Sequence, residues 1–306
     1  MFAKFKTLPQ LFDYFKDEKT CLEYWEQIRW NGNVTCPHCG AENPYKTNRG
    51  YKCRNIGCQK KFSALVGSIF ENSKIPLRTW FGAIYLCTAH KKGVSSCQIA
   101  RDLGIHQKSA WFLLHRIRET FKDLDPTRLK DVVSVDETFI GGKNKNRHAD
   151  KKVEGGQGGA GEDKTIVLGA MQIGGIVVTQ IVPDREADTL LPILQEMVED
   201  GSILVTDEHR AYYRAKDNFF HIKVNHNEGE YAHNAFSTNN LEGFWSLLKR
   251  SIVGIYHYVS PEHLQAYCNE TAYRYNTRNS TCPERFESTM NRLEGKRLKY
   301  NTLIAK

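Results

Sequence analysis

Acidic side chains follow two apolar stretches that have the composition of buried strands. The β-branched run 132–135 is followed at once by Asp136 and Glu137, and a second apolar strand, expected at 202–207, ends in Asp207. If the two strands lie side by side, Asp136 and Asp207 occupy neighbouring positions on one sheet. Carboxylates brought together without partners repel one another, so we expect this group to hold cations.

A third acidic side chain, Glu242, belongs to a helical pattern that starts near residue 239. Lys249 follows seven residues later, two helical turns on and on the same face. Ligation by oxygen alone selects hard cations, so we predict two Mg²⁺ (or Mn²⁺) ions of the kind that assist in-line displacement at a phosphodiester. Lys249 is expected to orient a phosphate or a DNA end. Glu137 is interpreted as either a supporting acid or an acceptor of N–H groups in a turn after the strand.

Four of the nine cysteines form two pairs with the spacing of metal ligands. Two residues separate Cys36 from Cys39, and four separate Cys53 from Cys58. Four thiolates fit tetrahedral Zn²⁺, and a closed four-sulfur shell leaves no open position for catalysis. We therefore predict one structural zinc, which helps to fold a ribbon over residues 31–66. Basic residues of this ribbon are candidates for contacts with DNA phosphates, among them Lys60 and Lys61.

A pair of helices is predicted within residues 77–125. In this stretch Gly104 separates two helical patterns and has the position of the left-handed residue that ends the first helix. The second helix is expected to begin near residue 107, with its polar face available to the major groove. This face comprises Gln107, Lys108, His115, Arg116 and Arg118, and we select Lys108, Arg116 and Arg118 as DNA-binding residues. An ordinary helical hairpin is the alternative.

The charge of the chain is uneven. Residues 1–130 contain 22 Lys and Arg against 11 Asp and Glu, whereas the remainder contains 21 against 24, and the formal net charge is +8. A basic front half favours a polyanionic partner. No apolar run approaches the roughly 20 residues of a membrane span, and the first residues lack the apolar region of a signal peptide. The expected location is cytoplasmic, associated with the nucleoid when bound to DNA, without a membrane partner.

The remaining patterns predict the elements that position these residues. Residues 1–30 predict one or two short amphipathic helices, and two β-rich runs on either side of Gly174 and Gly175 predict a hairpin. A helix is expected at about 187–199. The charged, glycine-rich segment 143–164 cannot pack a core and is predicted to be a mobile loop.

Taken in order, these motifs resemble those of insertion-sequence transposases of the ISXO type. The matching segments span about residues 15–280 and are "CPHCG…CRNIGC", "FSALVGSIFENSKIPLRTWF", "VDETFIGGK", "VTDEHRAYY", "NNLEGFWSLLKR" and "YRYNTR". The resemblance implies a multi-domain α+β protein, in which the zinc ribbon and helix-turn-helix precede an RNase-H-like domain. That domain, at 130–290, has a central mixed sheet flanked by helices, and 291–306 form a tail.

The resemblance also implies the activity of a DDE transposase. Such an enzyme cleaves and joins DNA at terminal inverted repeats with two Mg²⁺ ions and no covalent enzyme intermediate. Carried over to this chain, Asp136 and Asp207 are the first two catalytic acids and Glu242 is the third, with Asn240 as the alternative because some relatives have an amide near this position. The implied partners are double-stranded DNA, as terminal repeats and as target, and a second copy of the chain when two ends are synapsed.

Two other functions remain open from the sequence. A zinc-ribbon transcription regulator with a back domain that only dimerises would have no use for acids at the ends of two strands. An RNase-H-like nuclease that cuts without joining would use the same acids, because attack by water and attack by a 3′-hydroxyl require the same pair of metal ions.

Overall fold

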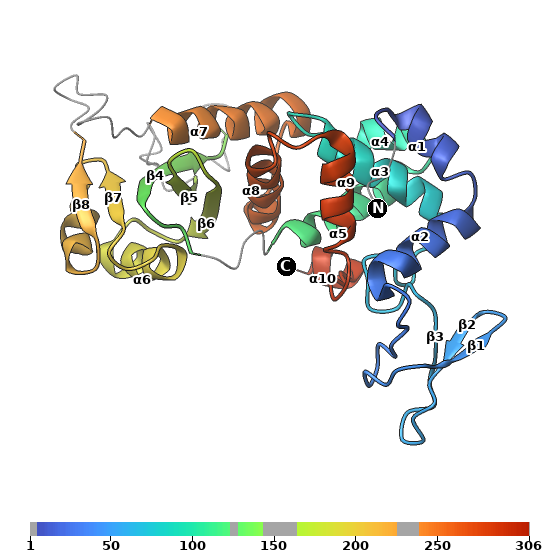
Figure 1. The fold of residues 1–306 in the computed structure, drawn as a ribbon. Coiled ribbons are helices and arrows are strands. Elements are labelled where there is room, and N and C mark those ends of the chain that lie inside the picture. Colours follow the sequence, from blue (N-terminus) through green and yellow to red (C-terminus); the bar gives the residue numbers. More distant parts are fainter. Residues whose placement is uncertain (1–4, 123–127, 143–163, 225–238, 306) are drawn as a thin grey trace. The chain divides into compact units, whose positions relative to one another are not determined.

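The computed structural model describes residues 5–122, 128–142, 164–224 and 239–305, in two compact units (Figure 1). The first unit comprises residues 1–122 and 279–306, and the second comprises 123–278. The sequence placed the segment up to residue 290 in the catalytic domain, whereas the structure groups all of 279–306 with the N-terminal part. The predicted mobile loop lies outside the described residues, except for Lys164.

Helices dominate the first unit, and its core is aromatic. Phe15 packs edge to face on Phe81, with 4.8 Å between the ring centroids. Phe286 packs on Phe5 at 5.2 Å and on Phe81 at 5.7 Å. These contacts explain why 279–306 joins the N-terminal part. The helices are α1 (Leu8–Tyr14), α2 (Glu18–Trp30), α3 (Leu77–Ala89), α4 (Ser96–Leu103), α5 (Gln107–Arg118), the short 3₁₀ helix η1 (Glu119–Phe121), α9 (Cys282–Met290) and α10 (Tyr300–Ile304).

Three short antiparallel strands form the predicted ribbon. They are β1 (Tyr45–Thr47), β2 (Gly50–Lys52) and β3 (Lys61–Phe62). The rings of Tyr51 and Phe62 stack at 5.6 Å between centroids, and Trp30 at the end of α2 packs edge to face on Tyr51. Trp25 of α2 also donates its indole N–H to the carbonyl of Ala64 at 2.8 Å. The small ribbon sheet is therefore anchored on α2.

A mixed five-stranded sheet forms the centre of the second unit, in the order β6-β5-β4-β7-β8. The strand β5 (Thr165–Gln172) pairs antiparallel with both β4 (Val132–Ile140) and β6 (Val177–Val182), and its pairing with β6 confirms the predicted hairpin. The strands β7 (Ile203–Thr206) and β8 (Phe220–Lys223) run parallel to β4. The sheet is therefore mixed, as the resemblance implies.

The strand β4 is longer than the sequence suggested. It continues beyond Val135 to Ile140, so Asp136 and Glu137 lie within the strand and not after it. The reason is the partner strand, since β5 pairs with β4 through these residues, Asp136 opposite Gly169 and Glu137 opposite Leu168. Cross-strand pairing overrides the low strand preference of acidic residues.

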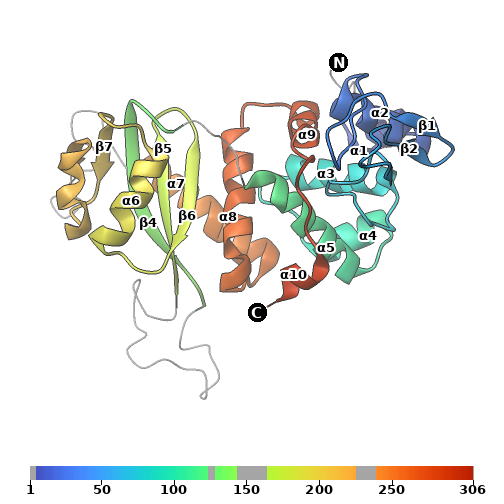
Figure 2. The ribbon, with the colours of Figure 1, turned by 90° about the horizontal axis from the view of Figure 1, so that it is seen from below.

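Helices cover both faces of the sheet (Figures 1 and 2). One face, with Val133 and Val135, packs against α6 (Ala187–Met197) and the 3₁₀ helix η4 (Arg210–Asp217). The other face, with Ile140 and Val167, packs against α7 (Asn239–Ser251) and α8 (Pro261–Asn276), and a π-helical turn, η6 (Ile252–Tyr256), follows α7. Alternate residues of β4 therefore point toward different helices. None of the helices in the described ranges combines the length and apolarity needed to cross a membrane.

Candidate active site and zinc centre

Asp136 lies within β4, and Asp207 directly follows β7, the strand that pairs in parallel with β4. In the ladder between β4 and β7, Ser134 is opposite Val205. Continued by two residues, this register sets Asp136 beside Asp207. The proximity has an electrostatic consequence, because the charge of Asp207 is among the causes that raise the pKa of Asp136. A negative potential therefore concentrates where the parallel pair ends, at the edge from which α/β sheets commonly present ligand-binding residues.

The carboxylate of Asp136 faces α7 and accepts two hydrogen bonds. Its Oδ2 accepts from the indole Nε1 of Trp245 at 2.9 Å, and its Oδ1 accepts from the backbone N–H of Glu137 at 2.9 Å. Burial, helped by the charges of Glu137 and Asp207, raises the pKa of Asp136 to about 6, although both hydrogen bonds favour the ionised form. A divalent cation at this carboxylate would stabilise the ionised form further.

Asp207 is half-buried and starts the turn from β7 into η4. Its Oδ1 accepts the backbone N–H of His209 at 2.9 Å. This bond fixes one carboxylate oxygen, and among the described residues the second oxygen accepts no side-chain or backbone hydrogen bond. The arrangement fits a residue that presents a carboxylate at the end of its strand.

Glu137 points to the opposite face of the sheet. Its Oε2 accepts from the Nη2 of Arg185 at 2.9 Å and from the Nε at 3.2 Å, while its Oε1 accepts from the hydroxyl of Tyr212. Burial and this carboxylate raise the pKa of Tyr212 well above its ordinary value, so the phenol stays protonated and donates. The interpretation of Glu137 as an acceptor in a turn is wrong, because the residue lies within β4. It ties the strand to η4, the helix that follows Asp207.

The candidates for the third position lie on α7. Asn240, Glu242 and Lys249 are all exposed. Trp245 lies three residues after Glu242 and four before Lys249. Glu242, Trp245 and Lys249 therefore share one side of the helix. Within the described ranges, the cysteines of the ribbon are the one group of three or more Cys, His, Asp or Glu residues whose ligand atoms lie within 4.8 Å of one another. The structure thus brings Asp136 beside Asp207 but does not gather Glu242 with them to that distance.

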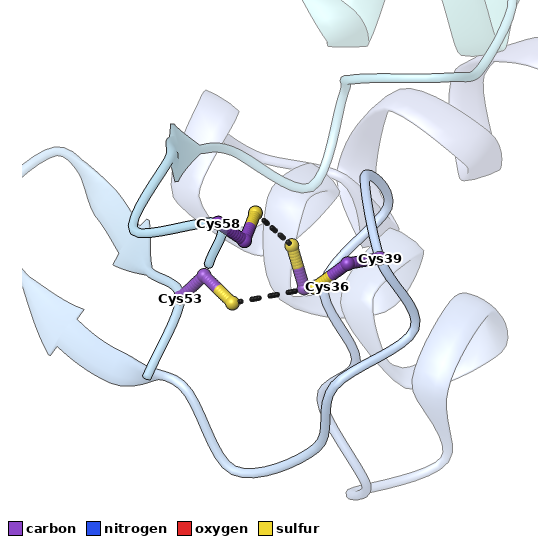
Figure 3. A group of neighbouring side chains, drawn as sticks. All are labelled: Cys36, Cys39, Cys53 and Cys58. Atoms are coloured by element: carbon purple, nitrogen blue, oxygen red, sulfur yellow. Dashed lines mark hydrogen bonds between the residues drawn. The ribbon is translucent and has the colours of Figure 1, made fainter. Parts of the chain in front are cut away.

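The four cysteines of the ribbon converge, as Figure 3 shows. Their sulfur atoms all lie within 4.8 Å of one another, with 3.9 Å from Cys36 to Cys58 and 3.5 Å from Cys39 to Cys53. A tetrahedron of thiolates around Zn²⁺, with Zn–S bonds of about 2.3 Å, has edges of about 3.8 Å. The backbone N–H of Ala41 lowers the pKa of Cys39 to about 7, whereas burial raises the pKa of Cys53 to about 12, so it is the geometry of the sulfur atoms that supports a metal. The set fits one structural zinc, and His38 is not part of it.

The helical pair differs from its prediction on one face. The helices α4 and α5 form, and Gly104 ends α4 in the left-handed conformation at φ 63°. Lys108 is exposed near the start of α5, whereas Arg116 and Arg118 are 4% and 1% exposed and His115 is buried with them. The expected exposure of these three side chains is wrong. They belong to the packed side of α5, and the role of the pair in DNA reading stays a prediction.

The burial of Arg116 has a specific cause. Its Nη2 donates to the carbonyl of Glu71 at 2.7 Å, and its guanidinium lies 5.5 Å from the ring centroid of Trp80 and 5.4 Å from that of Phe112. Desolvation lowers the pKa of Arg116 to about 10. The side chain joins α5 to the segment before α3, which removes it from the surface that could meet DNA.

Two residues at the carboxylate site were not predicted from the sequence. One is Trp245, which is buried and also donates a hydrogen bond to Asp136. Gly169 was not noticed, although a glycine within a strand often marks the close approach of another group. The stretch "VLGAM" carried that signal.

Comparisons with known proteins match the segments of the chain that carry these residues. A family model described as an ISXO2-like transposase domain matches residues 128–276, and one described as a transposase zinc-ribbon domain matches 16–61. An uncharacterized protein in transposable element ISH50 of Halobacterium salinarum is 28% identical over 253 residues, which are 77% of this chain and 83% of that protein. An uncharacterized transposase-like protein of Haemophilus influenzae is 34% identical over 101 residues, 33% of this chain and 80% of that protein.

The similarity to solved structures is low. The crystal structure of the Mos1 strand transfer complex matches over 65% of this chain and 74% of that chain, with 14% sequence identity and a TM-score of 0.29.

Proposed function

Since the chain belongs to the ISXO2-like transposases and carries their DDE catalytic domain, we propose that it binds terminal inverted repeats and catalyses DNA cleavage and strand transfer there. The observation that carries the proposal is the parallel pairing of β4 with β7, which sets Asp136 beside Asp207. Two neighbouring carboxylates repel each other, which contributes to the raised pKa of Asp136, and a divalent cation between them would remove this repulsion.

The proposed cofactor is a pair of Mg²⁺ (or Mn²⁺) ions held by Asp136, Asp207 and a third ligand from α7. Bound there, the ions would supply charge neutralisation for in-line displacement at a phosphodiester. Glu242 is the preferred third ligand, because it shares a side of α7 with Trp245, which contacts Asp136. Lys249, one turn beyond Trp245, is proposed to contact a phosphate of the bound DNA. Asn240 is the alternative third ligand.

The test is a strand-transfer assay with labelled duplex that carries the terminal repeats of the element and a supercoiled target, in Mg²⁺ and in EDTA. We expect joined products in Mg²⁺ and none in EDTA. Cleavage without joining would favour the nuclease, and specific binding without cleavage under any metal would favour the transcription regulator. In the same assay we expect Glu242→Gln to reduce joining by about 10³-fold, equivalent to about 4 kcal/mol. A loss of that size in Asn240→Ala, with Glu242→Gln active, would reverse the two assignments.

The proposed DNA-binding surface of the first unit uses residues that the structure leaves exposed. They are Lys108 near the start of α5 and Lys60 and Lys61 in the ribbon. Recognition helices read bases from their N-terminal residues, which suits Lys108, while the two ribbon lysines are placed as phosphate contacts. Arg116 and Arg118 are not part of this surface. Two copies of the chain are proposed to act together when two ends are synapsed.

Lys108→Ala tests whether α5 reads sequence. If Lys108 contacts a base edge, the substitution lowers discrimination between the terminal repeat and a scrambled duplex by about 1–3 kcal/mol, with little effect on the scrambled duplex. Fluorescence anisotropy titrations with both duplexes measure this. Lys122→Ala is the matched control, since Lys122 is an exposed lysine beyond the other end of α5, paired with Glu119 at 2.7 Å. If the affinity for both duplexes falls equally, Lys108 contacts a phosphate. If neither affinity falls, Lys108 does not contact the DNA.

A further inference from the structure

The indole of Trp245 lies over the strand pair that carries the first acid. The side chain is 4% exposed, on the face of α7 that packs against the sheet. Its Nε1 donates to the Oδ2 of Asp136 at 2.9 Å. In the ladder between β4 and β5, the residue opposite Asp136 is Gly169. The indole therefore meets two directly opposed positions of the sheet, an acid on one strand and a glycine on the next.

Gly169 leaves the space that the indole occupies. A Cβ atom at this position would lie 2.5 Å from the Cζ2 of Trp245, 2.6 Å from its Cη2 and 3.3 Å from the Cδ1 of Leu241. Contacts of 2.5 Å are far inside van der Waals distance, and a buried indole in a packed core has little room to retreat. Any larger residue at position 169 must move the ring, and with it the N–H that reaches Asp136.

The hydrogen bond leaves the acid free to bind a cation. A carboxylate has about four lone-pair sites. Asp136 uses one at Oδ2 for Trp245 and one at Oδ1 for the backbone N–H of Glu137. No residue in the described ranges donates to the remaining sites, and the two donors hold the plane of the carboxylate in one orientation. Donors of this kind, which contact a ligand and not the metal, orient metal ligands in many proteins.

We propose that Trp245 is a positioning residue for the metal site, and that Gly169 is required because it admits the indole. The proposal rests on the proposed function in one respect, namely that Asp136 is a metal ligand. Trp245 lies on the same side of α7 as Glu242 and Lys249, so the same contact fixes the rotation of this helix against β4. One side chain thus orients the first acid and places the helix that carries the proposed third.

The first test is Trp245→Phe, which keeps an aromatic ring and removes the N–H donor. We expect the affinity of the DNA-free protein for Mn²⁺, measured by electron paramagnetic resonance of the free ion, to fall by about 10-fold to 100-fold. Mg²⁺-dependent strand transfer should fall by a similar factor, while the melting temperature changes little. Trp80→Phe is the matched control, because it removes another buried indole N–H, which donates to the hydroxyl of Ser73 at 2.9 Å in the first unit.

The second test uses Gly169→Ala alone and in the Trp245→Phe background. Alone, it should weaken Mn²⁺ binding about as much as Trp245→Phe does. If Gly169 acts through the indole, the alanine adds little loss once the indole is gone, so the two effects are strongly non-additive. Fully additive losses would overturn the role given to Gly169. Unchanged Mn²⁺ affinity in a folded Trp245→Phe variant would overturn the role given to Trp245.

Failure of this inference can be separated from failure of the proposed function. Asp136→Asn defines how much of the bound Mn²⁺ belongs to this site. If the unmodified protein binds no Mn²⁺ there, the inference is overturned, and the strand-transfer assay then decides whether the proposed function fails with it. If the unmodified protein joins DNA in Mg²⁺ while Trp245→Phe keeps full activity and Mn²⁺ affinity, the inference alone fails.

Discussion

Asp136→Asn and Asp207→Asn should each abolish strand cleavage and strand transfer while the protein still binds DNA. Each substitution keeps the shape of the side chain and removes a negative charge that would hold a divalent cation between β4 and the end of β7. Metal ions at such a site contribute several kcal/mol to the stabilisation of the transition state. A loss of at least about 4 kcal/mol reduces the rate by about 10³-fold or more. The measurement is joined product per unit time in Mg²⁺, alongside anisotropy titrations of the terminal repeat.

Asp188→Asn provides the control for these substitutions. Asp188 is an exposed aspartate of the same unit, paired with the exposed Arg214 at 2.9 Å. Surface pairs of this kind contribute little to stability, so activity should stay unchanged. If Asp136→Asn or Asp207→Asn retained more than about a tenth of the activity, the loss would be near 1 kcal/mol, too small for a lost metal ligand. The two acids would then lose their place in the site.

Removal of zinc should unfold the ribbon and end specific recognition of DNA. The three ribbon strands have two or three residues each, and their buried side chains are Tyr51 and Phe62. A sheet of this size lacks the core to fold alone, whereas a structural zinc supplies about 10–16 kcal/mol in peptides of comparable size. In Cys53→Ser we expect zinc content to fall from one per chain to none, and affinity for the terminal repeat to approach the non-specific level, typically about 10³-fold weaker or more.

Cys97→Ser is the matched control for the zinc prediction, because Cys97 is an exposed thiol outside the cluster. It should keep full zinc content and DNA affinity. Zinc content is measured by mass spectrometry of the metal after gel filtration. Retention of one zinc per chain in Cys53→Ser would show that the ion is held elsewhere. Loss of zinc with unchanged DNA affinity would confine the ribbon to a structural role.

The sequence was sufficient for features with local causes. Two cysteine pairs at short spacing predicted the cluster of four sulfur atoms, and the glycine pair between two β-rich runs predicted the hairpin of β5 and β6. Apolar runs followed by acids predicted that Asp136 and Asp207 lie near each other if the two strands pair, and β4 and β7 do pair in parallel. In each case the residues that decide the structure are close in sequence, or the pattern repeats with the period of the element.

Features with distant causes were missed. Arg116 and Arg118 have the spacing of an exposed polar face, but partners from the segment before α3 bury the first of them, and no local pattern carries that information. The end of β4 at Ile140 depends on the length of β5. The hydrogen bond from Trp245 to Asp136 joins residues 109 positions apart. Tertiary partners override local preference at all of these positions.

The first unit is discontinuous in sequence, and this affects the order in which the two units fold during synthesis. Residues 1–122 emerge from the ribosome long before 279–306, which supply Phe286 to the aromatic core around Phe5, Phe15 and Phe81. Until then this core is incomplete and its apolar rings stay accessible to chaperones. The second unit, encoded between the two segments, is synthesised before the first is closed. A nascent chain therefore acquires its carboxylate-bearing sheet before its N-terminal core is complete.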